Sequence, residues 1–228
     1  GSQHFHEGTK RLYDLRILRM TSETLRSGVT CCQFAANRYW VNGKPAEVSA
    51  LPIIDRRSIS SRAVFSLKQG QTLRMEKLCT VHTSRDARWE NEPFSVEKLE
   101  EEGMNALQEA EALGYDRLFA ESAAVWEKLW QEIDVQIDGD NDFDQLAIRF
   151  AQYHMNSFIL KDDSRVGVAA KGLSGEGYKG HSFWDTEIFL FPYFLLTQPE
   201  AARTLLEYRY NTLAGARKKA TENGCAGA

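Results

Sequence analysis

One stretch of the chain, Gly172–Glu187, is dense in unusual features and reads GLSGEGYKGHSFWDTE. Its first nine positions hold four glycines, a composition that predicts an irregular loop. Trp184 and Asp185 follow at the start of a predicted helix, so an indole face and a carboxylate stand side by side. A sugar ring needs such a pair, because its C–H face stacks on an aromatic ring while a carboxylate accepts hydrogen bonds from adjacent hydroxyls. On spacing alone the alternative stays open, namely an N-cap aspartate beside a core tryptophan.

Helical patterns flank this loop on both sides. After Pro93 the apolar residues recur near every 3.6 positions, which predicts amphipathic helices. The first helix begins after the N-cap Ser95 and ends at Gly114, where the left-handed helical conformation is favoured. The helix around Leu146 and Phe150 is expected to be buried on one side. The later helices are predicted at Tyr115–Glu132, at Phe143–Leu160, at Asp185–Leu196 with Pro192 accommodated near its start, and after Pro199.

The chain before Pro93 has a β-type pattern. Between Lys10 and Cys79, apolar runs of four to eight residues alternate with turn signals, as in antiparallel hairpins. The strongest signal is Asn42–Gly43, because both residues accept the positive φ of a type I′ turn, and Gln69–Gly70 is a second. Successive hairpins of this kind predict a β-sandwich. The strands are expected around Leu12–Leu18, Cys32–Ala36, Tyr39–Val41, Ala63–Leu67 and Leu73–Val81.

The composition is that of an ordinary globular protein. Of the 228 residues 43% are hydrophobic and 26% are charged, and the formal net charge is −4. This acidic balance, without a long Lys/Arg stripe, argues against nucleic acid and anionic membranes as partners. Four cysteines without CxxC spacing, scattered histidines and an acidic Asp134–Asp144 stretch that lacks calcium-loop spacing predict no metal site. Without a signal peptide or a long apolar run, the protein is expected to be cytoplasmic.

The loop also supports a more specific interpretation. The whole segment Gly172–Glu187 closely resembles the start of the catalytic barrel in family 65 of the glycoside hydrolases, which includes the maltose, kojibiose, nigerose and trehalose phosphorylases. Further matching positions are Arg19–Thr24 and Ala147–Phe150. Near the end of the chain, Tyr208–Tyr210 and Leu213–Arg217 match as well, so the resemblance spans most of the sequence.

The resemblance implies a multi-domain α+β fold. Residues 1–92 would be the C-terminal part of an antiparallel β-sandwich domain, 93–136 a helical linker, and 137–228 the opening helices of an (α/α)6 barrel. Further sandwich strands and the helices that close the barrel are then expected outside this chain, which is interpreted as a fragment of a larger enzyme. Because family members are commonly dimers, a homodimer is also implied.

The resemblance further implies roles for four residues of the loop. Trp184 and Asp185 would line the subsite for the transferred glucose, as stacking platform and hydroxyl acceptor. Tyr178 and His181 are close enough in sequence either to reach the cavity or to brace the loop. The general-acid glutamate and the phosphate-binding residues are implied to lie beyond residue 228. No catalytic residue is therefore expected in this chain, which alone is expected to be inactive.

The implied reaction is inverting phosphorolysis of an α-linked glucose disaccharide. One carboxylic acid protonates the glycosidic oxygen while inorganic phosphate attacks the anomeric carbon from the opposite face, which gives β-glucose 1-phosphate and an acceptor sugar. Phosphate is a co-substrate, no cofactor is implied, and Glu176 and Glu187 receive no catalytic role. Two other functions stay open: an inverting hydrolase of the trehalase kind and a non-catalytic sugar-binding fragment. The linkage and the acceptor are not decided by these residues.

Overall fold

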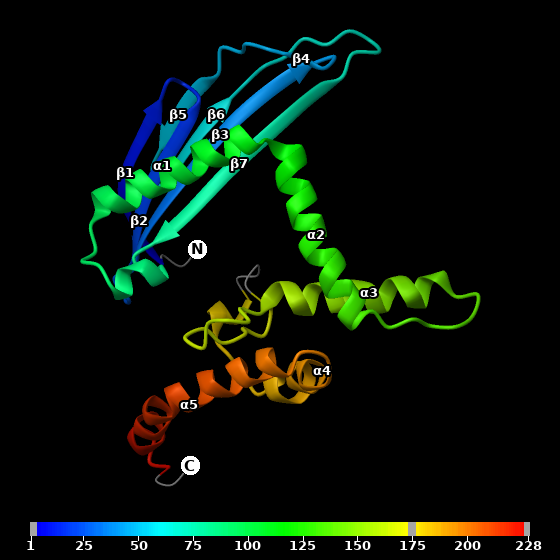
Figure 1. Cartoon of the computed structure of the whole chain (residues 1–228). Coiled ribbons are helices and arrows are strands. Elements are labelled where there is room, and N and C mark those ends of the chain that lie inside the picture. Colours follow the sequence, from blue (N-terminus) through cyan, green and yellow to red (C-terminus); the bar gives the residue numbers. More distant parts are fainter. Residues whose placement is uncertain (1–3, 173–176, 226–228) are drawn as a thin grey trace. The chain divides into compact units, whose positions relative to one another are not determined.

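The computed structural model describes residues 4–172 and 177–225. The chain divides into two compact units, Gly1–Ala123 and Ala124–Ala228. Along the chain the strands come first and the long helices follow, as the change from blue and cyan arrows to green and orange coils shows in Figure 1. The predicted order of antiparallel strands followed by helices is thereby confirmed. Among the described residues, no helix is long and apolar enough to cross a membrane.

The first unit is built on a five-stranded antiparallel sheet with the order β1-β2-β3-β4, in which β7 also pairs with β3. The central strand β3 pairs with β2 along one edge and with β7 along the other. As in any strand, successive side chains of β3 point to opposite faces of the sheet. A separate two-stranded hairpin joins β5 and β6. The strands are β1 (Phe5–Tyr13), β2 (Ile17–Thr24), β3 (Thr30–Val41), β4 (Lys44–Pro45), β5 (Leu51–Asp55), β6 (Ser58–Arg62) and β7 (Leu73–Thr83), and a 3₁₀ turn, η1 (Ala87–Glu90), follows.

The core of this unit lies between one face of the sheet and the helix α1 (Val96–Leu113). The sequence explains which face is buried, because Cys32, Phe34 and Ala36 occupy every second position of β3 and are all buried. The helix begins as predicted, where the Ser95 hydroxyl accepts a hydrogen bond from a backbone N–H of the first turn at 3.4 Å. The buried core residues are Ile17, Cys32, Phe34, Ala36, Leu99 and Leu107.

Gly103 lets α1 approach the sheet closely. A Cβ atom added at Gly103 would lie 2.7 Å from the Phe34 ring, so this position has room only for glycine. The Thr80 hydroxyl of β7 donates a hydrogen bond to the Gly103 carbonyl oxygen at 2.9 Å. Beside them, the almost fully buried Arg19 pairs with Glu100 of the helix. A buried guanidinium needs such a partner, so this pair fixes how the helix lies on the sheet.

The predicted strand at Ala63–Leu67 is wrong. This segment has no regular structure, and the strands of the region are β5 and β6, joined by a turn in which Arg57 has a φ of 65°. A strand needs a hydrogen-bonded neighbour, and among the described strands this segment has none. Instead Phe65 packs on Tyr39, with 5.0 Å between the ring centroids. The hairpin that does form contains Pro52 and several serines, so its strands do not show the apolar pattern by which strands are predicted.

The predicted turn at Asn42–Gly43 is confirmed, since Asn42 has a φ of 50° and Gly43 a φ of 76° between β3 and β4.

Gly43→Ala is expected to lower the free energy of unfolding by about 1 kcal/mol, because a Cβ is strained at positive φ. The matched control is Gly215→Ala in the helix α5 (Pro199–Glu222), where φ is not positive and nothing crowds the site. This control is expected to stabilise the chain. Urea unfolding measures both effects, and a neutral Gly43→Ala would contradict the strain.

The helix α1 is followed at once by α2 (Tyr115–Ile133), as predicted. The helix α2 begins in the first unit and ends in the second. Gly114 separates the two helices with a φ of 75° and a ψ of 160°. The φ is positive, but this ψ lies far outside the left-handed helical region, so the predicted αL conformation is wrong. Glycine is still the residue that this φ favours, because it has no Cβ to clash.

The second unit contains α3 (Asp142–Phe158), α4 (Phe191–Thr197) and α5. The predicted helix from Asp185 is present, but its first part is a π-helical turn, η3 (Thr186–Leu190). Pro192 explains the change, since it cannot donate a hydrogen bond to the preceding turn and the helix adjusts around it. The buried core residues of this unit are Ile159, Val168, Phe194, Ala201, Ala202 and Leu205.

The helix α3 is buried on one side, as predicted, but of the predicted apolar stripe it is Phe158 that packs on the core, and the start of the stripe is exposed. Leu146 and Phe150 are 64% and 63% exposed, and the buried positions of the helix are Gln152 and Asn156. The amides explain this orientation, because Asn156 Nδ2 donates to the Tyr193 hydroxyl at 3.0 Å and Gln152 Nε2 donates to a backbone carbonyl at the end of α2. Buried amides are retained where such partners exist.

Candidate functional site

The glycine-rich loop leaves the core of the second unit at Gly172. This residue has a φ of 64°, and an added Cβ would lie 2.6 Å from the Phe158 ring, so glycine is favoured on both grounds. Residues 173–176, and Glu176 with them, lie outside the described residues. The next residues form a 3₁₀ turn, η2 (Gly177–Gly180). The prediction that the glycines exclude regular structure is therefore wrong for this part of the loop, because short 3₁₀ turns suit connecting segments.

Tyr178 and His181 lie together at this turn. The His181 N–H donates to the Tyr178 carbonyl oxygen at 3.0 Å. The Tyr178 ring stands edge-on against Phe183, with 5.3 Å between the centroids. Tyr178 also has a φ of 57°, a conformation that costs a non-glycine residue roughly 1 kcal/mol or more and that clusters at ligand sites. Both Tyr178 and His181 are exposed, so both can reach a ligand.

Trp184 and Asp185 stand at the start of the helix that follows. Trp184 is 72% exposed, so it is not a core tryptophan. Asp185 is also exposed, and its side chain makes no capping hydrogen bond. The interpretation as an N-cap aspartate beside a core tryptophan therefore does not describe the structure. Adjacent residues present an open indole and a carboxylate that the helix does not use.

Arg209 of α5 holds the backbone that carries this pair. Its guanidinium donates to both carboxylate oxygens of Glu187, at 2.6 and 2.9 Å, and to the Phe183 carbonyl oxygen at 2.6 Å. These two partners lie on either side of Trp184 and Asp185 in the sequence. Hydrogen bonding to Glu187 raises the pKa of the Arg209 guanidinium. A bidentate guanidinium–carboxylate contact also fixes the relative orientation of the two side chains more than a single ammonium charge would.

A second contact fixes the first turn of the helix. Thr186 is buried, and its hydroxyl donates to the Val168 carbonyl oxygen at 3.2 Å. Neither Thr186 nor Arg209 received a role at the site from the sequence. No local pattern could have assigned one, because these contacts join residues 18 and 22 positions apart.

A small cavity of about 290 Å³ lies beside the loop. Gly167, Ser182 and Tyr208 pack closely in its wall, since a Cβ added at Gly167 would lie 2.4 Å from the Tyr208 ring and 2.5 Å from the Ser182 hydroxyl. None of the four residues predicted for the site lines this cavity. The structure thus brings those four residues to one exposed segment and not into one enclosed space.

The exposed groups of this segment are an indole, a carboxylate, a phenol and an imidazole. They combine an apolar face with hydrogen-bond donors and acceptors, which is what a polyhydroxylated ring requires. In the described part of the chain, no group of three or more His, Cys, Asp or Glu side chains is arranged to hold a metal ion. Chemically, the segment is equipped to bind and orient a sugar.

Comparison with known proteins covers both parts of the chain. Residues 1–129 match the family model described as "Glycosyl hydrolase family 65, N-terminal domain", and residues 149–228 match "Glycosyl hydrolase family 65 central catalytic domain". A kojibiose phosphorylase from Halothermothrix orenii is 46% identical over 228 residues, which are 100% of this chain and 29% of that protein. A kojibiose hydrolase from Flavobacterium johnsoniae is 47% identical over 115 residues, which are 50% of this chain and 16% of that protein.

The fold is also similar to a solved one. A candidate kojibiose phosphorylase from the human microbiome superposes with a TM-score of 0.75 at 23% identity, and the match covers 96% of this chain and 27% of that chain. At this identity the likeness concerns the fold alone. The chain spans less than a third of the length of the relatives that it matches. Because the N-terminal domain model alone matches more than half of the sequence, the chain belongs to glycosyl hydrolase family 65.

Proposed function

We propose that this chain is part of an inverting phosphorylase that transfers glucose from an α-glucosidic disaccharide to inorganic phosphate. The products are β-glucose 1-phosphate and the acceptor sugar. Membership of family 65 supports this function, as does the identity to a protein named kojibiose phosphorylase. The observation that carries the proposal is the exposed indole of Trp184 beside the uncapped carboxylate of Asp185.

In this proposal different loop residues contact different parts of one glucose ring. Trp184 stacks on the C–H face of the ring, and Asp185 accepts hydrogen bonds from two adjacent hydroxyls. Tyr178 and His181 bind the margin of the same ring or brace the loop against it. Arg209 is a positioning residue, because it touches the backbone around the pair and not the sugar.

The chemistry needs one acid and one nucleophile. A proton passes from a carboxylic acid to the glycosidic oxygen as the bond from that oxygen to the anomeric carbon breaks, and a phosphate oxygen forms the new bond on the opposite face. Phosphate takes the place of water and general base, so it is the co-substrate and the proposal includes no cofactor. We place the general acid and the phosphate-binding residues outside these 228 residues. The chain alone then binds sugar without turning it over.

A chimaera tests the proposal. The 228 residues replace the matching segment of the Halothermothrix orenii kojibiose phosphorylase, which aligns with the whole chain. The chimaera is expected to form glucose 1-phosphate from kojibiose, and Asp185→Asn is expected to lower kcat/KM roughly 100-fold, because a charge-assisted contact in the transition state is lost. The matched control is Asp140→Asn, an exposed carboxylate in the connection before α3, which is expected to have no effect.

Two results would reject this assignment. One is a folded chimaera that is inactive towards kojibiose, nigerose, trehalose and maltose while the parent enzyme is active. The other is an Asp185→Asn chimaera with the activity of the Asp140→Asn control. Both results are read only for preparations with the circular dichroism spectrum of the parent enzyme.

One comparison favours a second function, because a relative that is 47% identical over half of this chain is named kojibiose hydrolase. An inverting hydrolase uses water and a second carboxylate as general base, and it needs no phosphate. The product separates the two functions. Free glucose released in phosphate-free buffer supports the hydrolase, whereas glucose 1-phosphate that forms only with phosphate supports the phosphorylase. A folded chain that binds sugar but supports neither reaction in the chimaera is a binding module.

We also propose that the complete protein is a cytoplasmic homodimer. The four cysteines are free, which suits a reducing compartment. The dimer follows from the family resemblance. Sedimentation of the complete protein at one or two times its chain mass decides between monomer and dimer.

A further inference from the structure

A cavity of about 1010 Å³ lies in the first unit, at a gap in the edge of β3. The pairing of β3 with β2 ends at Ala36, opposite Ile17, and pairing on β4 begins only at Trp40, opposite Pro45. Between these points this edge of β3 has no strand beside it among the described residues, whereas β7 pairs with the other edge. We call this cavity the edge pocket, and it is lined by residues 14–16, 37–40, 45–52 and 61.

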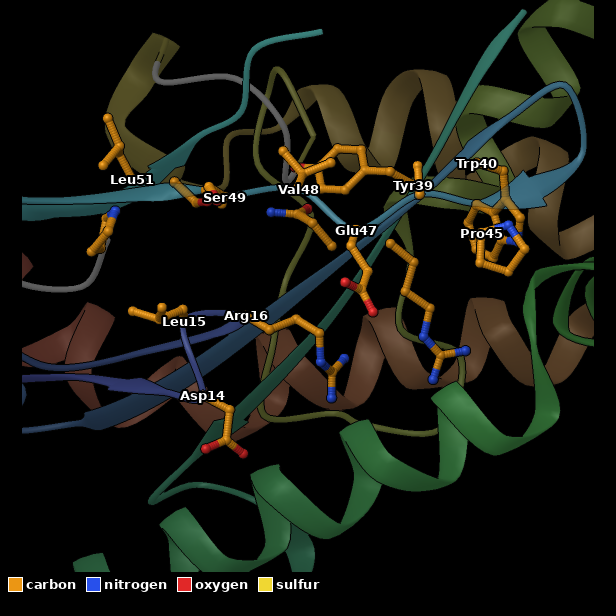
Figure 2. Close-up of a pocket in the computed structure, with 16 residues that line it drawn as sticks. Asp14, Leu15, Arg16, Tyr39, Trp40, Pro45, Glu47, Val48, Ser49 and Leu51 are labelled. Carbon is orange, nitrogen blue, oxygen red and sulfur yellow. The ribbon is translucent and has the colours of Figure 1, made fainter.

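The edge pocket is bounded by two connections that the fold holds in unusual shapes. Below the gap lies the turn between β1 and β2, in which Asp14 and Leu15 have φ values of 48° and 55°. Leucine rarely adopts this conformation, and it is 62% exposed here. Above the gap, residues 46–50 pass as an irregular strap, anchored where the Ala46 N–H donates to the Tyr39 carbonyl oxygen at 2.9 Å. Figure 2 shows the turn and the strap on opposite sides of the open space.

The charges around the edge pocket balance. Arg16 and Arg38 share the buried carboxylate of Glu111: Arg16 Nη2 donates to it at 3.2 Å and Arg38 Nε at 3.1 Å. Glu47 of the strap is exposed and points into the same space as Arg16, whereas the Asp14 carboxylate points away from it (Figure 2). The lining therefore offers guanidinium donors on one side and a carboxylate acceptor on the other, without a strong excess of either charge.

One group in the lining lacks a partner. Asn37 Oδ1 is buried, and it accepts no hydrogen bond from the described residues. It has almost no accessible surface, so a ligand in the pocket does not contact it directly. The groups that a ligand in the pocket can contact are a carboxylate, two guanidiniums and apolar side walls at Leu15 and Val48.

We propose that the edge pocket is a second carbohydrate site, which binds one or two neutral sugar rings separately from the Trp184–Asp185 site. Sugar hydroxyls can donate to the exposed Glu47 carboxylate and accept from Arg16, while the apolar walls cover the C–H faces. A phosphate does not fit as well, because Glu111 already neutralises one guanidinium charge and Glu47 would repel an anion. A purely apolar ligand would take the Glu47 carboxylate out of water without giving it a partner.

The test is an NMR titration of the isotopically labelled 228-residue chain with Trp184→Ala, which removes the stacking platform of the other site. Kojibiose is expected to move the amide signals of residues 37–39 and 47–49 to saturation, and inorganic phosphate is expected to leave them in place. Glu47→Gln is expected to raise the Kd roughly tenfold, because a charge-assisted hydrogen bond is lost. Glu101→Gln, on an exposed position of α1, is the matched control and is expected to leave the Kd unchanged.

The outcomes separate this site from the proposed function. Signals of residues 37–39 and 47–49 that stay in place in a folded chain at saturating kojibiose overturn the inference, even if the Trp184 site binds. Movement with phosphate alone also overturns it. If these signals move but the unmodified chain shows no response at residues 178–187, the edge pocket is retained and the sugar role of Trp184 and Asp185 is rejected.

Discussion

Gly103→Val is expected to lower the free energy of unfolding of the first unit by about 3 kcal/mol, the upper part of the range for overpacked cores. A Cβ at this position would lie 2.7 and 2.8 Å from two carbons of the Phe34 ring. That ring is only 2% exposed, so it cannot turn away from the new group. The helix has to move instead, which would break the hydrogen bond from Thr80 to the Gly103 carbonyl oxygen. Urea unfolding followed by circular dichroism measures the loss.

Two further variants make this expectation specific. Glu101→Val, at an exposed position of the same helix, keeps the same new side chain and is expected to change stability by less than about 1 kcal/mol. Phe34→Leu makes room below the helix, so the double variant with Gly103→Val is expected to lose less than the two single losses together. Strictly additive losses would show that the valine does not meet the ring.

Arg209→Met is expected to weaken sugar binding at Trp184 and Asp185 roughly tenfold. A tenfold rise in Kd corresponds to about 1.4 kcal/mol, which is within the range of interaction energies between residues of one hydrogen-bond network. The guanidinium bonds Glu187 and the Phe183 carbonyl, so its loss frees the backbone on both sides of the pair. The exchange keeps a side chain of similar length and removes the donors. The Kd for kojibiose, from an NMR titration of the 228-residue chain that follows the indole N–H signal of Trp184, measures the effect.

The matched control is Arg203→Met, on the same helix, whose guanidinium contacts Glu207 one turn away at the surface. Its Kd is expected to equal that of the unmodified chain, since exposed pairs contribute little. Hydrogen exchange gives an independent readout, because Arg209→Met is expected to speed exchange at residues 184–188 while Arg203→Met does not. Faster exchange with an unchanged Kd would show that Arg209 orders the turn without serving the sugar.

Local rules account for the parts of the fold that were predicted correctly. The turn at Asn42–Gly43 and the helix start after Ser95 depend on the chemistry of adjacent residues, and both are found. The alternating burial of β3 likewise follows from period-two spacing. Such features are decided within a few positions of the chain, so a single sequence contains what is needed to predict them.

Features that depend on distant partners were not predicted. The segment Ala63–Leu67 has the composition of a strand but finds no neighbour, whereas the hairpin of β5 and β6 pairs despite Pro52 and its serines. The buried amides of Gln152 and Asn156 likewise depend on groups of α2 and α4, not on the pattern of α3. In each case the deciding contact joins elements that no local window contains.

The candidate site divides in the same way. The loop segment and the pair Trp184–Asp185 were predicted from their residue types and from the family resemblance, and their sugar role stays a prediction. Arg209 and Thr186 were missed as supports, because their partners lie in other parts of the unit. A close look at Gly172 could have suggested the packing on Phe158, since a glycine at a loop entrance commonly marks a close approach.

The proposed function depends most on the binding of the glucose unit of an α-glucosidic disaccharide by Trp184 and Asp185. The most direct test is to titrate the 228-residue chain with kojibiose and to follow the indole N–H signal of Trp184 by NMR, with the signal identified from Trp184→Phe. If the pair binds glucose, this signal is expected to shift to saturation, with a Kd that rises in Asp185→Asn. A Trp184 signal that stays in place in the folded chain, with kojibiose, nigerose, trehalose and maltose alike, would contradict it.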